Sequence, residues 1–204
     1  DNYQCSYGGT LKAPRLGDLI YKDLNGDCVI DEKDYAPITN GGIPEVFYAF
    51  NAGFRYKSLE FNILFQGVGR YETAGYNSSY NLGRNYEGIY NPQLENAWTP
   101  ERYASGAKIT SPALSASETS SDQMYNDYYV EDRAFLRLKN VEIAYTLPLK
   151  FSKKISADKI RFSLSGQNLV TWSRMKNKDI DPEIGSLHVL PVYRVYNIGV
   201  SLLF

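Results

Sequence analysis

The stretch VFYAFNAGFRYKSLEFNILFQ, residues 46–66, decides the fold that we expect for this chain. Over residues 46–56, apolar or aromatic side chains alternate with small, polar or charged ones. Residues 59–66 repeat the pattern, and only Lys57 and Ser58 separate the two halves. Alternation of this kind predicts β-strands, and a two-residue connection predicts a tight antiparallel hairpin.

Three later segments show the same alternation: residues 135–147, 159–170 and 194–204. In the first of them the phase slips near Lys139 and Asn140, which predicts a β-bulge. No segment has the periodicity of a long helix. The sequence therefore predicts an all-β, antiparallel fold built on about five strands.

The connections between these strands alternate between short and long. Lys57-Ser58 and residues 148–159 are short, whereas residues 67–132 and 172–193 are long and rich in Tyr, Asn, Ser, Gly and Pro. Compact soluble domains rarely carry such long connections. Outer-membrane β-barrels combine short periplasmic turns with long extracellular loops, and this pattern favours a transmembrane barrel segment.

Composition limits the other classes of function. The chain has 204 residues and a net charge of −1, so charge gives no case for nucleic acid binding or for adhesion to anionic lipid. No apolar run approaches the ~20 residues of a membrane-spanning helix. There are 18 tyrosines and a single histidine. Tyrosine favours strands and membrane–water boundaries.

Aromatic side chains bracket the apolar faces of the expected strands. We predict that they form a lipid-facing girdle: Tyr48, Tyr56, Tyr145, Tyr196 and Phe204. The chain stops on Phe204, with apolar residues at every second position back to Tyr196, as expected of the last strand of an outer-membrane barrel. The alternative is a soluble β-sandwich, such as a secreted, calcium-dependent carbohydrate-binding module.

An orientation follows if Phe204 lies at the periplasmic side. Residues 1–44 and the two long connections are then extracellular, and residues 45–204 supply barrel strands and loops. Five strands cannot close a membrane barrel, because unpaired strand edges are too costly in lipid. We therefore expect residues 1–204 to be a single partial domain, the C-terminal part of a larger barrel or a chain that pairs with another one.

The stretch DLNGDCVIDEKD, residues 23–34, has the spacing of a calcium-binding loop. Six residues would supply ligands at positions 1, 3, 5, 7, 9 and 12: Asp23, Asn25, Asp27, Val29, Asp31 and Asp34. Position 6, usually glycine, is Cys28. The alternative is a turn-rich loop whose Asp and Asn side chains cap their own backbone. Cys28 and Cys5 could pair in an oxidising compartment, which two cysteines alone do not decide.

Catalysis has little support. His188 is the only histidine, and no serine and aspartate are obviously placed to form a catalytic triad with it. Asp181 and Glu183 lie in a turn, and we do not expect them to act as a general acid and base. No phosphate-binding glycine loop or zinc spacing is present. In the long connection, Trp98 could anchor the loop or contact a ligand, and Tyr86, Tyr90 and Tyr103 could stack on sugars or grip a partner.

Several motifs in order resemble the C-terminal end of SusC/RagA-type TonB-dependent outer-membrane receptors. They are GDLIYKDLNGDCVIDEKD, YAFNAGFRYKSLEFNILFQG, AWTPE, YVEDRAFLRLKNVEIAYTLP, IRFSLSGQNLVTWS, DIDPEIG and the terminal strand. The resemblance covers nearly the whole chain. It implies about five strands of a 22-stranded barrel with a plug, in the outer membrane of a Gram-negative, Bacteroidetes-like bacterium.

The resemblance also implies a function. Such receptors import oligosaccharides or peptides, with a SusD-like surface lipoprotein as a lid and with energy delivered through TonB to an N-terminal region. Such a barrel needs a polar interior, and one set of strand residues would supply it: Arg55, Glu60, Asn62, Gln66, Asn140, Glu142, Arg161 and Gln167. Each of these residues could equally do no more than hold the plug.

Overall fold

The computed structural model describes residues 5–9, 11–74, 91–114, 126–176, 178–185 and 189–204. The chain divides into two compact units, which we describe separately. The sheet unit comprises Asn40–Thr73 and Glu131–Phe204, and the loop unit comprises the residues up to Thr39 together with Ala74–Val130. None of the helices in the described ranges is long and apolar enough to cross a membrane.

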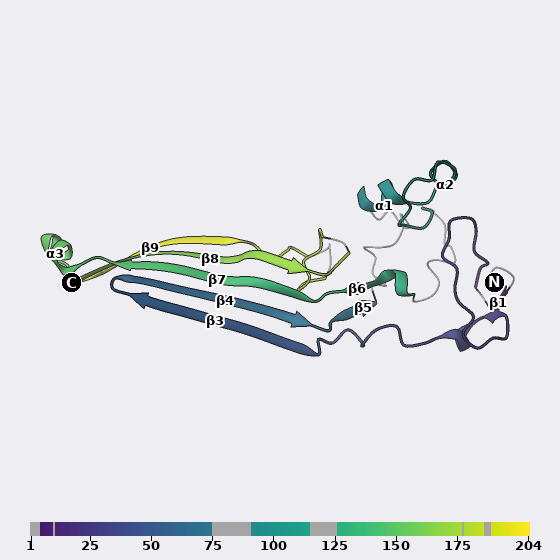
Figure 1. Ribbon diagram of the computed structural model, residues 1–204, viewed down its shortest axis with the longest axis horizontal. Helices are drawn as coiled ribbons and strands as arrows, with labels where there is room; N and C mark the ends of the chain where they lie inside the picture. Colours follow the sequence, from purple (N-terminus) through teal and green to yellow (C-terminus); the bar gives the residue numbers. More distant parts are fainter. Residues whose placement is uncertain (1–4, 10, 75–90, 115–125, 177, 186–188) are drawn as a thin grey trace. The chain divides into compact units, whose positions relative to one another are not determined.

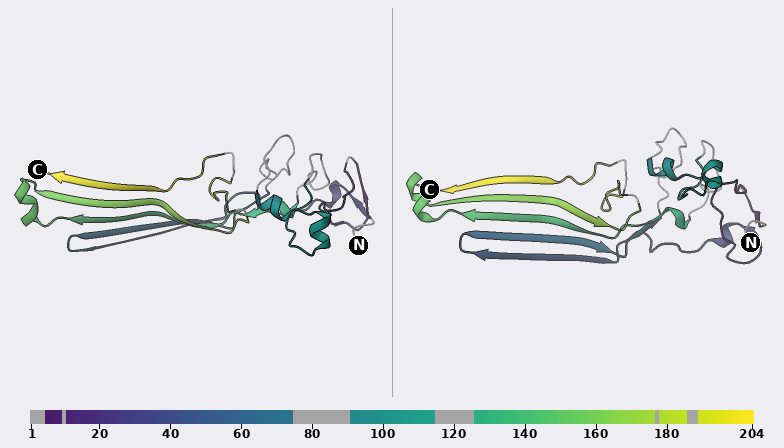
Figure 2. Two further views of the ribbon diagram at one scale, coloured as in Figure 1. Left: turned by 90° about the horizontal axis from the view of Figure 1, so that it is seen from above. Right: turned by 45° about the horizontal axis from the view of Figure 1, so that its top comes forward.

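The sheet unit is built on one five-stranded antiparallel sheet in the order β3-β4-β7-β8-β9. The five strands are β3 Val46–Tyr56, β4 Leu59–Gly69, β7 Phe135–Thr146, β8 Lys159–Ser173 and β9 Val195–Leu203. Each strand pairs with its neighbour in the chain order of these five, and Figure 2 shows them as one twisted layer. The predicted all-β antiparallel fold is confirmed, although β4 and β8 run further than the alternation indicated.

Register places apolar side chains on one face of all five strands. Directly paired residues point to the same face. One row of pairs joins Tyr56, Leu59, Tyr145, Phe162 and Val200. A second row, nearer the middle of the strands, joins Ala52, Ile63, Val141, Gly166 and Tyr196. We call this the apolar face, and the row between these two, with Phe54, Phe61 and Ile143, belongs to it as well. The residues that alternate with these rows along each strand point to the opposite, polar face.

A β-bulge preserves this division. The register shifts between Leu138 and Asn140 on β7, and between Leu64 and Phe65 on β4. The predicted slip near Lys139 is therefore confirmed. The extra residue lets Leu138 and Val141, an odd number of positions apart, both lie on the apolar face, because it shifts the alternation by one.

The two ends of the sheet differ. At one end, Lys57 takes the left-handed conformation, with φ 52°, in the two-residue turn between β3 and β4. The same end carries α3 (Leu149–Ser152) and the 3-10 turn η7 (Lys153–Ile155) between β7 and β8. At the other end, the short strands β5 (Glu72–Ala74) and β6 (Val130–Asp132) pair with each other.

The loop unit contains only short elements among its described residues. Strands β1 (Ser6–Tyr7) and β2 (Val29–Ile30) pair in parallel. The helical turns are η2 Glu32–Asp34, α1 Asn91–Asn96, α2 Pro100–Ala104 and η6 Asp127–Tyr129. Thr99 caps α2 by accepting the Arg102 N–H at 3.2 Å, as Ser and Thr do at helix starts. Ile30, Ala97 and Tyr129 are among the buried apolar residues that the structure describes in this unit.

Candidate functional site

The polar face of the sheet carries a chain of alternating charges at the end near the β3–β4 turn. Arg55 on β3 lies 2.8 Å from a carboxylate oxygen of Glu60 on β4. The Arg161 guanidinium on β8 bridges Glu60 at 3.2 Å and Glu142 on β7 at 2.8 Å. Four neighbouring strands are thereby linked by ion pairs. Arg55 itself remains 73% exposed, so this network keeps a charge available to whatever the polar face meets.

A second network, further along the polar face, is centred on Arg137. This side chain is 1% exposed, although it is long and charged. Its guanidinium binds both oxygens of Asp181, at 2.7 and 2.8 Å, and reaches Glu183 at 2.7 Å. Its Nε donates to Thr171 on β8 at 2.9 Å. Each of the three guanidinium nitrogens therefore has an acceptor, and such full pairing is what permits an arginine to be buried.

Arg137 therefore fixes the segment that follows β8. Arg133 adds to the hold by donating to the carbonyls of Pro182 and Glu183. Met175 and Ile180 in the same segment are buried. The carboxylates of Asp181 and Glu183 are occupied by Arg137, which is a structural use of both side chains.

The predicted calcium loop is held by its own side chains. Asp23 accepts the N–H groups of Gly26 at 2.6 Å and Cys28 at 2.9 Å. Asp27 accepts the Val29 N–H at 2.9 Å, and Asn25 accepts the Asp27 N–H at 2.8 Å. Each carboxylate thus stabilises a turn of the backbone, in the way that Asx turns do.

Asp34 closes the same loop. Its two oxygens accept the N–H groups of Leu24 at 2.8 Å and Asp31 at 2.9 Å. Asp31 in turn caps η2 by accepting the Lys33 N–H, which makes a reciprocal capping box with Asp34. Hydrogen bonds from the Asp31 and Leu24 backbone lower the pKa of the Asp34 carboxyl.

The loop does not present a ready metal cage in this conformation. In the described part of the chain, no three or more Asp, Glu, His or Cys side chains gather so as to hold a metal ion. The carbonyls of Cys28 and Ile30 accept the Ser6 and Gly8 N–H groups, so the Val29 carbonyl points away from β1. Each carboxylate keeps lone pairs beyond those used here. A calcium ion would require these side chains to turn inward, and its binding stays a prediction.

Cys28 takes the backbone conformation that position 6 of such a loop demands. Its φ is 57°, in the left-handed region where glycine is usual. Its side chain forms a disulfide with Cys5, which ties the loop to the segment before β1. Both features decide points that the sequence left open.

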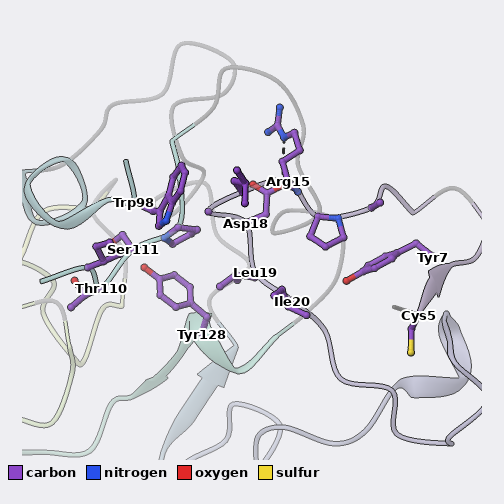
Figure 3. A pocket seen from close by; sticks show the side chains of 16 residues that line it. Cys5, Tyr7, Arg15, Asp18, Leu19, Ile20, Trp98, Thr110, Ser111 and Tyr128 are labelled. Atoms are coloured by element: carbon purple, nitrogen blue, oxygen red, sulfur yellow. Dashed lines mark hydrogen bonds and ion pairs between the residues drawn. The ribbon is translucent and has the colours of Figure 1, made fainter. Parts of the chain in front are cut away.

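A pocket of about 640 Å³ lies in the loop unit (Figure 3). Trp98 and Tyr128 line one side, and Tyr7 lines the other. The Asp18 carboxylate accepts the Arg15 N–H at 2.9 Å at its edge. Burial raises the pKa of the Tyr7 phenol. The lining mixes aromatic faces with a few polar groups, a combination found in ligand sites.

Trp98 is held rather than free in this pocket. The backbone N–H of Trp98 donates to the Ser111 carbonyl at 2.9 Å. Gly17, with φ 89°, lies so close to the indole that a Cβ at this position would overlap it. Trp98 is therefore an anchor of the loop unit that also lines its pocket. Tyr103 is 72% exposed, whereas Tyr86, Tyr90 and His188 lie outside the described residues.

The predicted girdle residues share one face of the sheet. Tyr56 and Tyr145 belong to the row nearest the β3–β4 turn, and Tyr48 lies at the opposite end of β3. Tyr196 lies in the middle row, and Phe204 directly follows β9. Tyr56 follows Tyr48 by eight positions, which span ~26 Å at ~3.3 Å per residue, close to the height of the apolar band of a membrane barrel.

Comparison with known proteins places these features in a family. No family model matches the chain. TonB-dependent receptor P26 of Formosa agariphila is 32% identical over 183 residues, 85% of this chain, and receptor P3 of the same organism is 29% identical over 165 residues. The RagAB peptide importer in its open-open state superimposes with a TM-score of 0.60 at 24% identity over 79% of the chain.

The chain belongs to the TonB-dependent receptors. Its five-stranded sheet is a segment of their β-barrel. The chain spans 15 to 17% of the length of the curated receptors named above, and 17% of the RagAB chain. In this receptor segment, the buried Arg137 network is the feature that the sequence did not reveal. Its only local signal was a charged residue flanked by leucines at 136 and 138.

Proposed function

We propose that this SusC/RagA-type segment forms part of the wall of an active importer in the outer membrane of a Bacteroidetes-like bacterium. The observation that carries the proposal is the division of the sheet into an apolar and a polar face that is continuous across five strands. Lipid would meet the apolar face, and a water-filled or plugged lumen would meet the charge network of Arg55, Glu60 and Arg161.

The sheet itself supports this assignment over a secreted sandwich module. Large apolar side chains of the outer strands are exposed, among them Phe50 at 61% and Ile198 at 86%. Among the described residues, the sheet unit holds no second large sheet that would cover them. In lipid these side chains need no cover, whereas in water they would form an aggregation-prone patch.

The cargo we propose is an oligosaccharide or a peptide. RagAB, a fold neighbour, is a peptide importer, and the curated relatives are TonB-dependent receptors. We further propose a SusD-like lipoprotein lid on the extracellular side, energy from TonB through a region outside this chain, and a plug within the rest of the barrel. Tyr48, Tyr56 and Tyr145, with Phe204, would lie at or near the lipid–water boundaries. Tyr196, in the same row as Ile63, would lie within the apolar band.

Two neighbouring substitutions in the complete receptor test the wall assignment. Ile63 lies on the apolar face in the middle row, and Asn62, the preceding residue, lies on the polar face. Arginine facing lipid at midplane costs about 2–4 kcal/mol. We expect Ile63→Arg to reduce the amount of heat-resistant barrel in outer membranes, while Asn62→Arg preserves it. The reverse ranking would show that the two faces are wrongly assigned.

Cargo and partner need separate measurements. Growth on oligosaccharides or on peptides as the sole nutrient, in strains with and without the receptor gene, identifies the cargo class. Purification of the receptor from native membranes in mild detergent shows whether a SusD-like lipoprotein accompanies it. Growth that is equal in both strains on every nutrient, together with purification of the receptor alone, would contradict the import proposal.

A further inference from the structure

The connection between β7 and β8 is a basic turn with two exposed apolar side chains. We define the basic turn as residues 149–156, which contain α3 and η7. Leu149 is 61% exposed and Phe151 is 51% exposed. Lys150, Lys153 and Lys154 lie between and beside them, and all three are exposed. Apolar and cationic groups therefore share one short surface.

The backbone of the basic turn is held firmly by the sheet. The Leu147 N–H donates to the Ile160 carbonyl, and the Asp158 N–H donates to the Leu203 carbonyl at 2.7 Å. Ser152 and Ala157 are buried, at 0% and 1% exposure. The exposed lysines and apolar side chains therefore project from a fixed frame.

The lysines of the basic turn have no carboxylate partner. In the described ranges, none of the three forms an ion pair, whereas the arginines of the polar face are paired. The ammonium of Lys154 lies 6.0 Å from the centre of the Phe151 ring. Lys57, in the β3–β4 turn at the same end, lies 5.2 Å from the Tyr56 ring centre. Positive charge thus collects at this end, which the net charge of −1 conceals.

The basic turn continues the apolar face. The strand row next to it contains Tyr145 and Phe162, exposed at 42% and 46%. Phe204, exposed at 75%, follows β9 at the same end, as Figure 1 shows. Side chains that would meet acyl chains are therefore followed by cations at the level where headgroups begin. Lysines at such a boundary extend their ammonium groups toward the headgroups.

We propose that the basic turn binds anionic glycerophospholipid headgroups, with Leu149 and Phe151 inserted among the acyl chains. This rests on the proposed placement of the segment in the outer membrane. The turn lies at the short-connection end of the strands, which in membrane barrels is the periplasmic end, where the leaflet consists of phospholipid. Clustered lysines beside a membrane each attract anionic lipid, and buried apolar side chains add to the binding.

The test uses the complete receptor in nanodiscs of phosphatidylcholine containing one-third phosphatidylglycerol. After mild detergent extraction, native mass spectrometry counts the lipids of each class that stay bound. We expect wild-type receptor to retain phosphatidylglycerol in preference to phosphatidylcholine at low salt. In the variant K150Q/K153Q/K154Q, the preference for phosphatidylglycerol should fall at least about fivefold. A fall of this size corresponds to about 1 kcal/mol, the contribution of a single lysine near an anionic surface.

Further variants separate the effect of the lysine charges from that of inserting apolar side chains into the membrane. K108Q/K178Q removes two lysines outside the basic turn and should leave the preference unchanged. Leu149→Ser with Phe151→Ser should lower the retention of both lipids while preserving their ratio. Salt at 0.5 M should weaken the wild-type preference, because charge screening acts on exposed lysines.

Three outcomes would overturn the proposal: no wild-type preference, an equal loss in K108Q/K178Q, or an undiminished preference in the triple variant. The heat-dependent shift of the barrel band on gels is recorded for every sample. A folded barrel without lipid preference would overturn this proposal alone. A wild-type receptor that forms no heat-resistant barrel would overturn the proposed function as well.

Discussion

The phenol of Tyr48 lies across Gly67 of the neighbouring strand and donates a hydrogen bond to the Phe135 carbonyl, two strands away, at 2.8 Å. A Cβ at Gly67 would overlap both the Tyr48 ring and that carbonyl. The missing side chain of Gly67 is thus what lets one tyrosine link β3, β4 and β7. Aromatic rings that cover a strand glycine in this way help to fix the register of a sheet.

Gly67→Ala should destabilise the barrel by about 1–3 kcal/mol, because the new methyl group must displace the Tyr48 ring. Gly69→Ala is the matched control, since its Cβ would meet Val46 and Tyr48 at 3.7 and 3.8 Å, which is ordinary contact. Tyr48→Phe should cost about 0.5–1.5 kcal/mol by removing one hydrogen bond. The stability of the three variants is ranked by the temperature at which the folded barrel of the complete receptor unfolds, seen as a shift of its band on a gel. Equal effects of the two glycine substitutions would refute the explanation.

Arg137→Met should destabilise the receptor by about 3–5 kcal/mol, because it leaves Asp181, whose side chain is 13% exposed, without its charge partner. Arg137→Lys should not rescue it, because one ammonium cannot reach Asp181, Glu183 and Thr171 together, which three separate guanidinium nitrogens do. Lys139→Met is the control, since this lysine lies 3.5 Å from Glu183 and is 31% exposed. Limited proteolysis should cut between residues 174 and 185 in the first two variants only. Resistance of all three variants to cleavage would argue against the conclusion that Arg137 fixes the segment after β8.

Acidification should loosen the calcium-like loop through Asp34. Because backbone N–H groups of Asp31 and Leu24 hold the Asp34 pKa below its usual 3.8, folding favours the ionised form. The stabilisation is therefore complete above about pH 4 and disappears as the pH falls through the lowered folded-state pKa. Hydrogen exchange of residues 23–34, corrected for intrinsic rates, should accelerate over this interval in wild type. Asp34→Asn should exchange fast at every pH, whereas Glu32→Gln should behave as wild type.

Calcium binding to the same loop is predicted to be weak. An isolated loop with Cys at position 6 resembles extracellular sites, whose Kd values lie near 10⁻⁴–10⁻³ M. Titration calorimetry of the complete receptor should detect such binding, and Asp23→Asn should remove it. Glu32→Gln, within the loop but at a non-ligand position, should retain it. The absence of any calcium-dependent heat up to 10 mM would eliminate calcium as a cofactor of this loop.

The disulfide between Cys5 and Cys28 should contribute about 3 kcal/mol to the stability of the loop unit, judged from its separation of 23 residues. Replacement of both cysteines by serine should remove this contribution. The variant Cys5→Ser with Cys28→Gly should recover ~1 kcal/mol, because glycine takes the φ of 57° without strain. The rate of proteolysis within residues 11–39 under oxidising conditions ranks the stability of wild type and the two variants. If the glycine variant is no more resistant than the serine variant, backbone strain at Cys28 is unimportant.

Much of the sheet could be predicted because alternation is a local property. Residues 46–66 alone indicate two strands, their hairpin and which side chains share a face, and the phase slip at Lys139 indicated the bulge. The exact strand ends could not be read in this way. β8 continues to Ser173 because Phe135 on β7 pairs with it there, and that pairing is a property of the neighbour.

The sequence by itself determined the all-β class and the two faces of the strands. The order of its motifs also indicated the receptor family. Only the tertiary structure decided which distant residues meet. Arg137 finds Asp181 and Glu183, which lie 44 and 46 positions later, and Cys5 finds Cys28. The physical reason is that periodicity records how each side chain points from its own strand. Burial of a charge, a disulfide or a tyrosine over a glycine depends on the path of the chain between the partners.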